Sequence, residues 1–439
     1  MAHLGDLGHS VIRRMTQYAE KHGATNLSQG FPNTGPPDGL KGSSILAMLG
    51  GNDAGIEMLL TESISAVLGY DVDTSVTTLP ELLAEIDESI ARSNQDVFNQ
   101  YSVPYGLLSL REAISRKVAE FNGIVADPEK NITVTCGATE ALFSTLTALI
   151  DRDKGEEVVV FQPFHEMYPN QLLIVGGTPR YASLKEPDWD LKNPQWQFDR
   201  EELNTIFNEK TTAIILTTPH NPSGKVFSDD DLMYIADLCI KHDTYVITDE
   251  IYEHMTYDGH NHVSMGSLDG MEDRTITINA ISKTYSATGL RVGWVIAPEE
   301  ITDKIRAIHD TIVIQAPTPI QKGTEMALGK LGPSYYQQLA QNYKERRDIL
   351  LQGLTDVGFR CANPEGSYYL FADFSGIRDD LKPMEFAMLL TERALVTPVP
   401  GDNFYATNGL GDNYVRFAFA REHETLERAV SQLRSVDLG

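Results

Sequence analysis

The sequence predicts an α/β protein, with a mainly parallel β-sheet between helices in a large domain and a smaller α+β domain. Short β-branched runs alternate with helical stretches between about residues 130 and 300. This alternation is typical of parallel strands, because consecutive parallel strands need a crossover long enough for a helix. The expected strands cover residues 131–135, 158–161, 213–218, 244–248, 275–279 and 292–297.

Helical patterns continue inside and on both sides of this region. Residues 10–22 are expected to form an amphipathic helix, and residues 232–242 carry helical spacing. A long helical pattern at 335–354 precedes short strands at 368–374 and 415–420. Because 439 residues exceed one ordinary core, we expect four parts: an N-terminal arm with part of the small domain (1–40), an insertion-containing helical segment (41–98), a large domain (99–310) and a C-terminal small domain (311–439).

The composition excludes several classes of partner. The chain has 36 basic and 62 acidic residues, a net charge of −26, whereas nucleic acids and anionic membranes require basic surface. No apolar run approaches the roughly eighteen residues that span a bilayer, so we expect a cytoplasmic protein. Cys136, Cys239 and Cys361 are isolated in the sequence, which indicates reduced thiols rather than a disulfide framework.

A small-residue turn follows the first expected strand and opens a helix. Gly137, Ala138 and Thr139 lie between the strand at 131–135 and an apolar helical stretch at 141–150. The unpaired N–H groups and the positive dipole end of a helix start suit a phosphate group. Similar turns are common without any ligand, so this motif alone is a weak indication.

Three polar residues follow later strands. Asn221 lies in a turn-rich segment that by itself is consistent with a plain loop. Asp249 ends an apolar strand, where a carboxylate either faces a ligand or caps the next helix. Lys283 follows the strand at 275–279, and burial together with Arg291 can lower the pKa of its ammonium group, as a Schiff-base lysine requires.

In this order, the segments resemble the class I and II aminotransferases of fold type I, especially the branch that contains kynurenine and methionine aminotransferases. The resemblance covers nearly the whole chain, from residues 10–15 to residues 416–420. It implies pyridoxal 5'-phosphate as the cofactor and a sheet of the seven-stranded type in the large domain. It also implies transfer of the amino group of an L-amino acid to a 2-oxo acid.

The resemblance implies a role for each matching residue. Lys283 would form the Schiff base and move protons between the substrate α-carbon and the cofactor. Asp249 would pair with the pyridinium nitrogen, and Asn221 and Tyr252 would hydrogen-bond the phenolic oxygen. The cofactor phosphate would be held by small, hydroxyl and cationic residues: Gly137, Ala138, Thr139, Ser282 and Arg291.

Further matches concern the substrate and the subunit contact. Arg416 matches the arginine that binds the substrate α-carboxylate as a bidentate pair. Asn221 also belongs to the expected substrate-binding site. Gly30 matches a loop glycine whose backbone supports that carboxylate. Tyr101 matches the tyrosine that reaches the phosphate of the neighbouring subunit, so the resemblance implies a homodimer with active sites shared across the interface.

The chain departs from the family pattern at three places. His165 stands where an aromatic ring usually stacks on the cofactor, and it either only stacks or also donates a proton or hydrogen bond to the substrate. Ala280 stands three residues before Lys283, where a serine usually contacts the phosphate. Phe31 and Asn99 are 68 positions apart, so an insertion lies between them that either covers the substrate entrance or is peripheral.

The close sequence spacing of His254, His260 and His262 is compatible with a metal site, but no carboxylate partner spacing accompanies it. The family needs no metal, so we expect none.

Two other functional hypotheses remain at this stage. The first keeps the cofactor but performs β/γ-elimination, replacement or cyclisation of a specialised amino acid in a natural-product pathway, and the departures at His165 and Ala280 motivate it. The second is a non-catalytic protein that retains the fold. The intact set of family residues argues against the second: Lys283, Asp249, Asn221, Tyr252 and Arg291.

Overall fold

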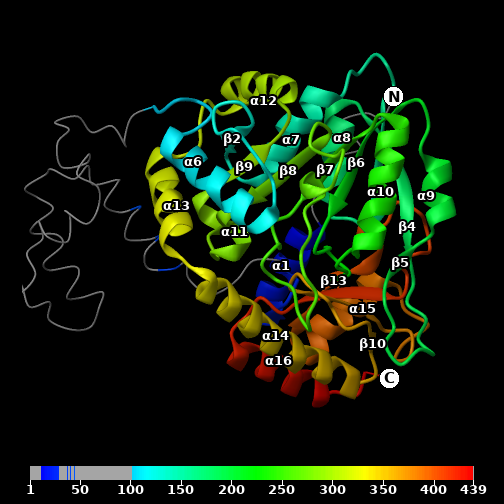
Figure 1. The fold of residues 1–439 in the computed structure, drawn as a ribbon. Helices are drawn as coiled ribbons and strands as arrows, with labels where there is room; N and C mark the ends of the chain where they lie inside the picture. Colours follow the sequence, from blue (N-terminus) through cyan, green and yellow to red (C-terminus); the bar gives the residue numbers. More distant parts are fainter. Residues whose placement is uncertain (1–10, 29–36, 38–39, 41–43, 45–100, 439) are drawn as a thin grey trace, which may run out of the picture.

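The computed structural model describes residues 11–28, 37, 40, 44 and 101–438 (Figure 1). The predicted insertion at 41–98 lies outside the described residues, apart from Ser44. None of the helices in the described part is both long and apolar enough to cross a membrane.

An eight-stranded sheet forms the centre of the molecule, in the order β2-β9-β8-β7-β6-β3-β4-β5. Neighbouring strands from β8 to β4 pair in parallel, whereas β9 is antiparallel to both β8 and β2. The strands are β2 (Ile132–Thr135), β3 (Glu157–Gln162), β4 (Thr178–Lys185), β5 (Gln197–Phe198), β6 (Thr211–Thr217), β7 (Tyr245–Asp249), β8 (Thr275–Ala280) and β9 (Gly293–Ile296).

The predicted α/β fold with a mainly parallel sheet is confirmed, and each of the six predicted strands of the sheet is present within two residues at either end. Strand β4 was not predicted, because its sequence contains Pro179, Arg180 and Lys185 and its side chains are mostly half-buried or exposed. It is the seventh strand, and the two-residue β5 adds an eighth by pairing antiparallel with its end.

Alternating side chains of the sheet enter two different cores. Val158 and Val160 pack on one face with helices α7, α8 and α12, whereas Val159 and Phe161 pack on the other face with α9 and α10. This is the period of two that a strand buried on both faces requires. The helices are α7 (Ala138–Leu149), α8 (Met167–Val175), α9 (Arg200–Ile206), α10 (Asp229–His242) and α12 (Glu299–Ile312).

A third core lies at the β2 edge of the sheet. Here Trp294 and Ile296 of β9 pack with Val134 of β2 and with two helices that lie side by side in Figure 1. These helices are α6 (Leu108–Lys117), which continues as the π-helix η2 (Val118–Asn122), and α13 (Thr318–Lys330).

The C-terminal part contains a four-stranded antiparallel sheet in the order β10-β11-β14-β13. N-terminal strand β1 pairs in parallel with β12 of the same part. The strands are β1 (Thr25–Asn26), β10 (Arg360–Cys361), β11 (Tyr369–Asp373), β12 (Val396–Thr397), β13 (Val399–Pro400) and β14 (Tyr414–Ala418). The helices are α1 (Val11–His22), α14 (Pro333–Asp356), α15 (Pro383–Leu389) with η5 (Leu390–Ala394), and α16 (His423–Arg434).

Short helical turns complete the described part. They are η3 (Met265–Ser267), α11 (Ile281–Thr284), η4 (Thr288–Leu290) and η6 (Gly401–Phe404).

We predict that Gly293→Ala destabilises the protein by about 1–3 kcal/mol, the usual cost of overpacking a filled core. A Cβ atom at Gly293 would lie 2.7 Å from the carbonyl carbon of Gly137 and 2.9 Å from the backbone nitrogen of Ala138. The midpoint of thermal unfolding, measured by circular dichroism, should therefore fall. Gly289→Ala is the matched control, because a Cβ there meets no atom within 4 Å. Equal midpoints for the two variants would contradict the prediction.

Candidate active site

The predicted site residues meet at one edge of the large sheet. Strands β2, β6, β7 and β8 all end at this edge. Asp249 is the last residue of β7, and the other three strands are followed by Gly137, Asn221 and Lys283. Strand β9 runs in the opposite direction and therefore begins here, two residues after Arg291. Ligands of parallel α/β sheets bind outside the carboxyl ends of the strands.

The start of α7 forms an anion site with Arg291. Gly137 has a φ of +83°, and a Cβ atom there would lie 2.4 Å from Nη2 of Arg291. The guanidinium is held by the carbonyl oxygens of Thr288 (2.8 Å) and Cys136 (3.1 Å). No side chain caps the helix start, so the N–H groups at Ala138 and Thr139 remain available. Free N–H groups beside a fixed cation fit a phosphate.

Lys283 lies in α11, the short helical turn that follows β8. Burial lowers the pKa of its ammonium group, and the charges of Arg416 and Arg291 lower it further against the opposing effect of Tyr369 and Asp249. The neighbouring Ser282 is buried. A lysine with a lowered pKa is a competent amine nucleophile and a proton carrier.

Asp249 is buried at the end of β7, and its Oδ2 accepts a hydrogen bond from the Tyr168 hydroxyl at 2.8 Å. The Tyr168 hydroxyl also lies 2.6 Å from Oγ1 of Thr217. Burial raises the pKa of Asp249 to about 6, although the hydrogen bond from Tyr168 and the charge of Lys283 oppose this shift. A buried carboxylate of this kind is stabilised by a cationic partner, such as a protonated ring nitrogen.

Arg416 comes from β14 and joins the small sheet to the large one. Its Nη1 donates to Oδ1 of Asn221 (2.8 Å), and its Nη2 donates to the Ser28 carbonyl (3.1 Å). The side chain is buried, and its Nε has no partner among the described residues. Because a buried donor without a partner is costly, this nitrogen is suited to a ligand carboxylate.

His165 carries a neutral ring. Burial lowers its pKa to about 3, with further lowering by Arg416 and Lys283. Its Nδ1 accepts from the Met167 backbone nitrogen at 3.4 Å, so the ring proton is on Nε2. At neutral pH the ring can stack or donate a hydrogen bond, but it is not charged.

The other predicted residues lie in different surroundings. Tyr252 is buried, with its hydroxyl 3.3 Å from that of Tyr369. Tyr101 is 77% exposed in the single chain. Gly30 lies outside the described residues, although the Ser28 carbonyl nearby contacts Arg416. Ala280 is buried, and no hydroxyl is present at its position.

Two tyrosines of the site were not predicted from the sequence. Tyr168 contacts Asp249, and Tyr369 contacts Tyr252 and packs under Arg416, with the Arg416 Cζ 4.2 Å from the ring centroid. Tyr369 lies in the predicted strand at 368–374, whereas Tyr168 lies in α8, which was not predicted. Hydrophobic patterns do not distinguish a core tyrosine from one whose hydroxyl reaches a site. Only their contacts in the tertiary structure identify them.

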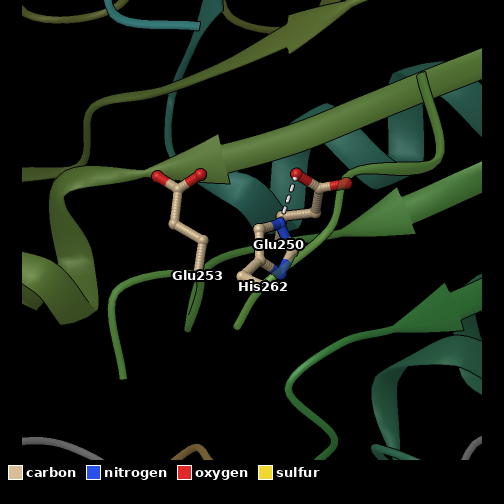
Figure 2. Close-up of side chains that lie close together, drawn as sticks. All are labelled: Glu250, Glu253 and His262. Atoms are coloured by element: carbon tan, nitrogen blue, oxygen red, sulfur yellow. Dashed lines mark hydrogen bonds and ion pairs between the residues drawn. The ribbon is translucent and has the colours of Figure 1, made fainter. Parts of the chain in front are cut away.

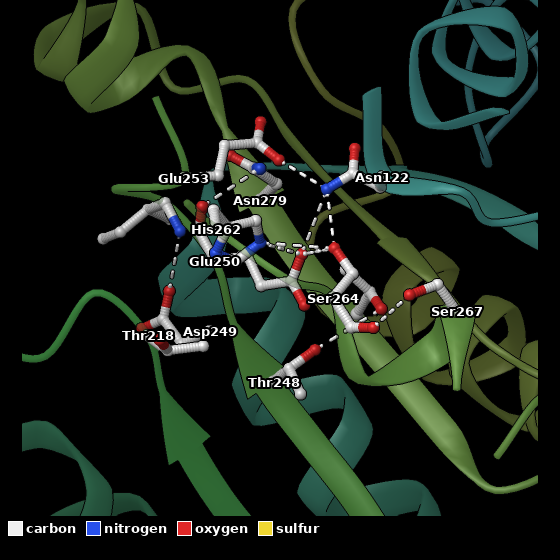
Figure 3. A network of polar contacts seen from close by, with 12 residues as sticks. Asn122, Thr218, Thr248, Asp249, Glu250, Glu253, His262, Ser264, Ser267 and Asn279 are labelled. Carbon is white, nitrogen blue, oxygen red and sulfur yellow. Dashed lines mark hydrogen bonds and ion pairs between the residues drawn. The ribbon is translucent and has the colours of Figure 1, made fainter. Parts of the chain in front are cut away.

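The absence of carboxylate partners for the histidines, inferred from sequence, is wrong for His262. Glu250 and Glu253 lie beside it, with one possible ligand atom of each residue within 4.8 Å of the others (Figure 2). Donors occupy only part of this cluster, because Oε1 of Glu250 and Nδ1 of His262 have no hydrogen-bond partner among the described residues. Asn122 Nδ2 donates to Glu250 (3.2 Å) and to Glu253 (2.8 Å), as Figure 3 shows. Burial raises the pKa of Glu253, but the charge of Lys117 lowers it to about 2. The arrangement is a hydrogen-bonded network with its own cation, and we assign no metal to it.

The sequence and the fold both match known proteins. The family model for class I and II aminotransferases matches residues 69–433. A kynurenine–oxoglutarate transaminase of Dictyostelium discoideum is 32% identical, over 97% of this chain and 94% of the relative. Human kynurenine–oxoglutarate transaminase 1 is also 32% identical, over 95% and 93%.

Two solved structures are similar over 99% of both chains. One is the N-succinyldiaminopimelate aminotransferase of Mycobacterium tuberculosis, with a TM-score of 0.83 and 27% identity. The other is YbdL of Escherichia coli, identified as having a methionine aminotransferase function, with a TM-score of 0.81 and 29% identity. The family match agrees with the lysine that follows β8 and with the uncapped start of α7 beside Arg291. The chain therefore belongs to the class I and II aminotransferases of fold type I, as an enzyme that depends on pyridoxal 5'-phosphate.

Proposed function

We propose that this aminotransferase takes the amino group from an aromatic L-amino acid of the kynurenine type and transfers it to 2-oxoglutarate. The single observation that carries the proposal is the arrangement around Arg416. Its guanidinium has an unpartnered Nε for a carboxylate, and the rings of Tyr369 and Phe404 pack against it at 4.2 and 4.8 Å. The names of two relatives with 32% identity point to the same pair of substrates.

Each site residue has a role in this proposal. Pyridoxal phosphate, when bound, supplies a carbonyl group that takes up nitrogen and a ring that accepts electrons. Asp249 would pair with the ring nitrogen, Asn221 and Tyr252 would bind the phenolic oxygen, and His165 would cover the ring face. The phosphate would be held at the start of α7 and by the residues around Lys283: Gly137, Ala138, Thr139, Ser282 and Arg291.

Lys283 would hold the cofactor covalently and would move the proton at the substrate α-carbon. The lowered pKa of its ammonium group supports this role, because a proton carrier must be partly neutral at the working pH. Arg416 and the backbone near Gly30 fix the α-carboxylate, which orients the Cα–H bond toward the site.

Transamination is favoured over β/γ-elimination, replacement or cyclisation, because the matched relatives and solved structures are aminotransferases. The departures at His165 and Ala280 do not favour the rival chemistry: His165 is neutral, with a pKa near 3.

A homodimer and a cytoplasmic location also belong to the proposal. The exposure of Tyr101 supports the homodimer, since a tyrosine that serves the neighbouring subunit is uncovered in a single chain.

Incubation with 2-oxoglutarate and a panel of amino acids that includes L-kynurenine should produce glutamate and the matching 2-oxo acid, detected by mass spectrometry. Lys283→Ala should abolish this turnover while the protein still binds the cofactor noncovalently. After borohydride reduction, the cofactor should remain on the wild-type peptide that contains Lys283. Lys304→Ala, an exposed lysine on α12, serves as the control. Loss of a side-chain fragment without glutamate formation would instead support the rival chemistry.

Asp249→Asn should lower kcat by about a hundredfold, the usual effect of removing one charge-stabilising group. The substitution should also change the pH dependence of the folding stability of the cofactor-free protein. The pKa of Asp249 in the folded state, about 6, is above its ordinary value of 3.8, so the wild-type folded state binds an extra proton between these pH values. Binding of this proton to Asp249 stabilises the wild-type folded state at low pH, and this stabilisation is lost as the pH rises through about 6.

The stability of Asp249→Asn relative to the wild type should therefore increase between pH 4.5 and pH 7, by on the order of 2 kcal/mol. Thermal unfolding of both cofactor-free proteins at the two pH values measures the difference. A difference that is the same at both values would contradict the pKa assigned to Asp249.

Tyr101→Phe should leave a dimer but raise the dissociation constant of the cofactor about tenfold, the effect of one lost hydrogen bond to a charged group. Light scattering gives the oligomeric state, and titration of the cofactor-free protein gives the affinity. Tyr234→Phe is a matched control, because its hydroxyl donates to the Arg200 carbonyl on the surface. A monomeric wild type would exclude the proposed role of Tyr101.

A further inference from the structure

Tyr369 lies at the junction of the two sheets. It is the first residue of β11, which pairs antiparallel with β14 so that Tyr369 faces Ala418 and Phe371 faces Arg416. Residues two apart on a strand share a face, so Arg416 is the diagonal neighbour of Tyr369 across the pair. The Arg416 Cζ lies 4.2 Å from the Tyr369 ring centroid, and both side chains are at most 2% exposed. Register therefore puts the two residues on the same face, and the side chains meet there with the ring beneath the guanidinium.

The hydroxyl of the same residue reaches the large sheet. Its Oη lies 3.3 Å from Oη of Tyr252, which belongs to the turn after β7 and is 117 residues away in the sequence. Ring and hydroxyl thus contact two different groups of the site, one for the substrate and one for the cofactor.

The charges around Tyr369 make its hydroxyl a strong hydrogen-bond donor. Burial raises the pKa of this hydroxyl, but the cations of Arg416 and Lys283 and the hydrogen bonds with Tyr252 and Tyr368 outweigh burial, so the pKa ends below the ordinary value. Other buried tyrosines of the site, such as Tyr168 and Tyr252, have raised pKa values instead. The shift supports the geometric argument, because a more acidic hydroxyl donates a stronger hydrogen bond.

We propose that Tyr369 is a positioning residue with two separable parts: its ring fixes the Arg416 guanidinium for the substrate carboxylate, and its hydroxyl donates to Tyr252 and orients it toward the phenolic oxygen of the cofactor. The proposal rests on the roles of Arg416 and Tyr252 in the proposed function. It goes beyond them by assigning a residue that couples the substrate site of the small sheet to the cofactor site of the large sheet.

Two substitutions separate the parts. Tyr369→Phe keeps the ring and removes only the hydroxyl. Tyr252 then loses a donor and becomes a weaker donor itself to the anionic phenolic oxygen. Tyr369→Leu removes both the ring and the hydroxyl, so Arg416 loses its cation–π contact in a site shielded from water.

For Tyr369→Phe, the pH midpoint of the absorbance change of the bound cofactor should rise by roughly half to one pH unit, the equivalent of one hydrogen bond. The KM for the best amino acid substrate should remain within about twofold, because the ring still supports Arg416. For Tyr369→Leu, the same midpoint should rise, and the KM should increase about tenfold.

The control is Tyr257→Phe, which removes the hydroxyl of another buried tyrosine that donates to the Ser367 carbonyl, two residues before Tyr369. It should change thermal stability without moving either the spectral midpoint or the KM. An unchanged or lower midpoint in Tyr369→Phe, or an equal KM in the Phe and Leu variants, would overturn the inference. Failure of the proposed function is distinguishable, since the wild type would then show no amino group transfer, whereas the absorbance of its bound cofactor would still titrate and would still test the effect of the Tyr369 hydroxyl.

Discussion

Because the backbone of β9 passes in van der Waals contact with the Gly137–Ala138 peptide, helix α7 begins directly beside the start of β9. This contact requires glycine at position 293, and it places Arg291 within reach of the uncapped helix start. The antiparallel direction of β9 is equally necessary. A parallel strand at this position would begin at the opposite edge of the sheet, and Arg291 would lie far from the ends of β2 and β8. The geometry of the anion site therefore follows from one close backbone approach and one strand direction.

The charges around Lys283 are balanced within a small buried volume. Arg416 and Arg291 lower the pKa of Lys283, whereas Asp249 and Tyr369 oppose them. Removal from water acts on acids and bases in opposite directions, so it raises the pKa of Asp249 and lowers that of Lys283. Both shifts reduce the charge that the site must carry without a ligand. A bound cofactor with a cationic ring nitrogen and an anionic phosphate offers partners to these groups, which is why the site is suited to that molecule.

The two sheets contribute different parts of the chemistry. Residues that follow strands of the large sheet surround Lys283, whereas Arg416 and Tyr369 come from the small sheet. The hydrogen bond between Arg416 and Asn221 joins the two sets at 2.8 Å. Any change in how the two sheets pack would therefore change the distance between Arg416 and Lys283. In the proposed function, substrate recognition by Arg416 and proton transfer by Lys283 depend on one packing arrangement for this reason.

The sequence by itself determined the strand order along the chain, the positions of Lys283, Asp249, Asn221 and Arg291 at strand ends, and the aminotransferase family. These features are local, because a strand that ends in a polar residue or a glycine turn is visible in a few consecutive letters. The sequence did not reveal β4, whose half-exposed side chains lack a clear period, or the carboxylates beside His262. Nor did it reveal the contacts of Tyr168 with Asp249 and of Tyr369 with Tyr252 and Arg416. Those contacts join residues far apart in the chain, and only the pairing of strands and the packing of the two sheets bring them together.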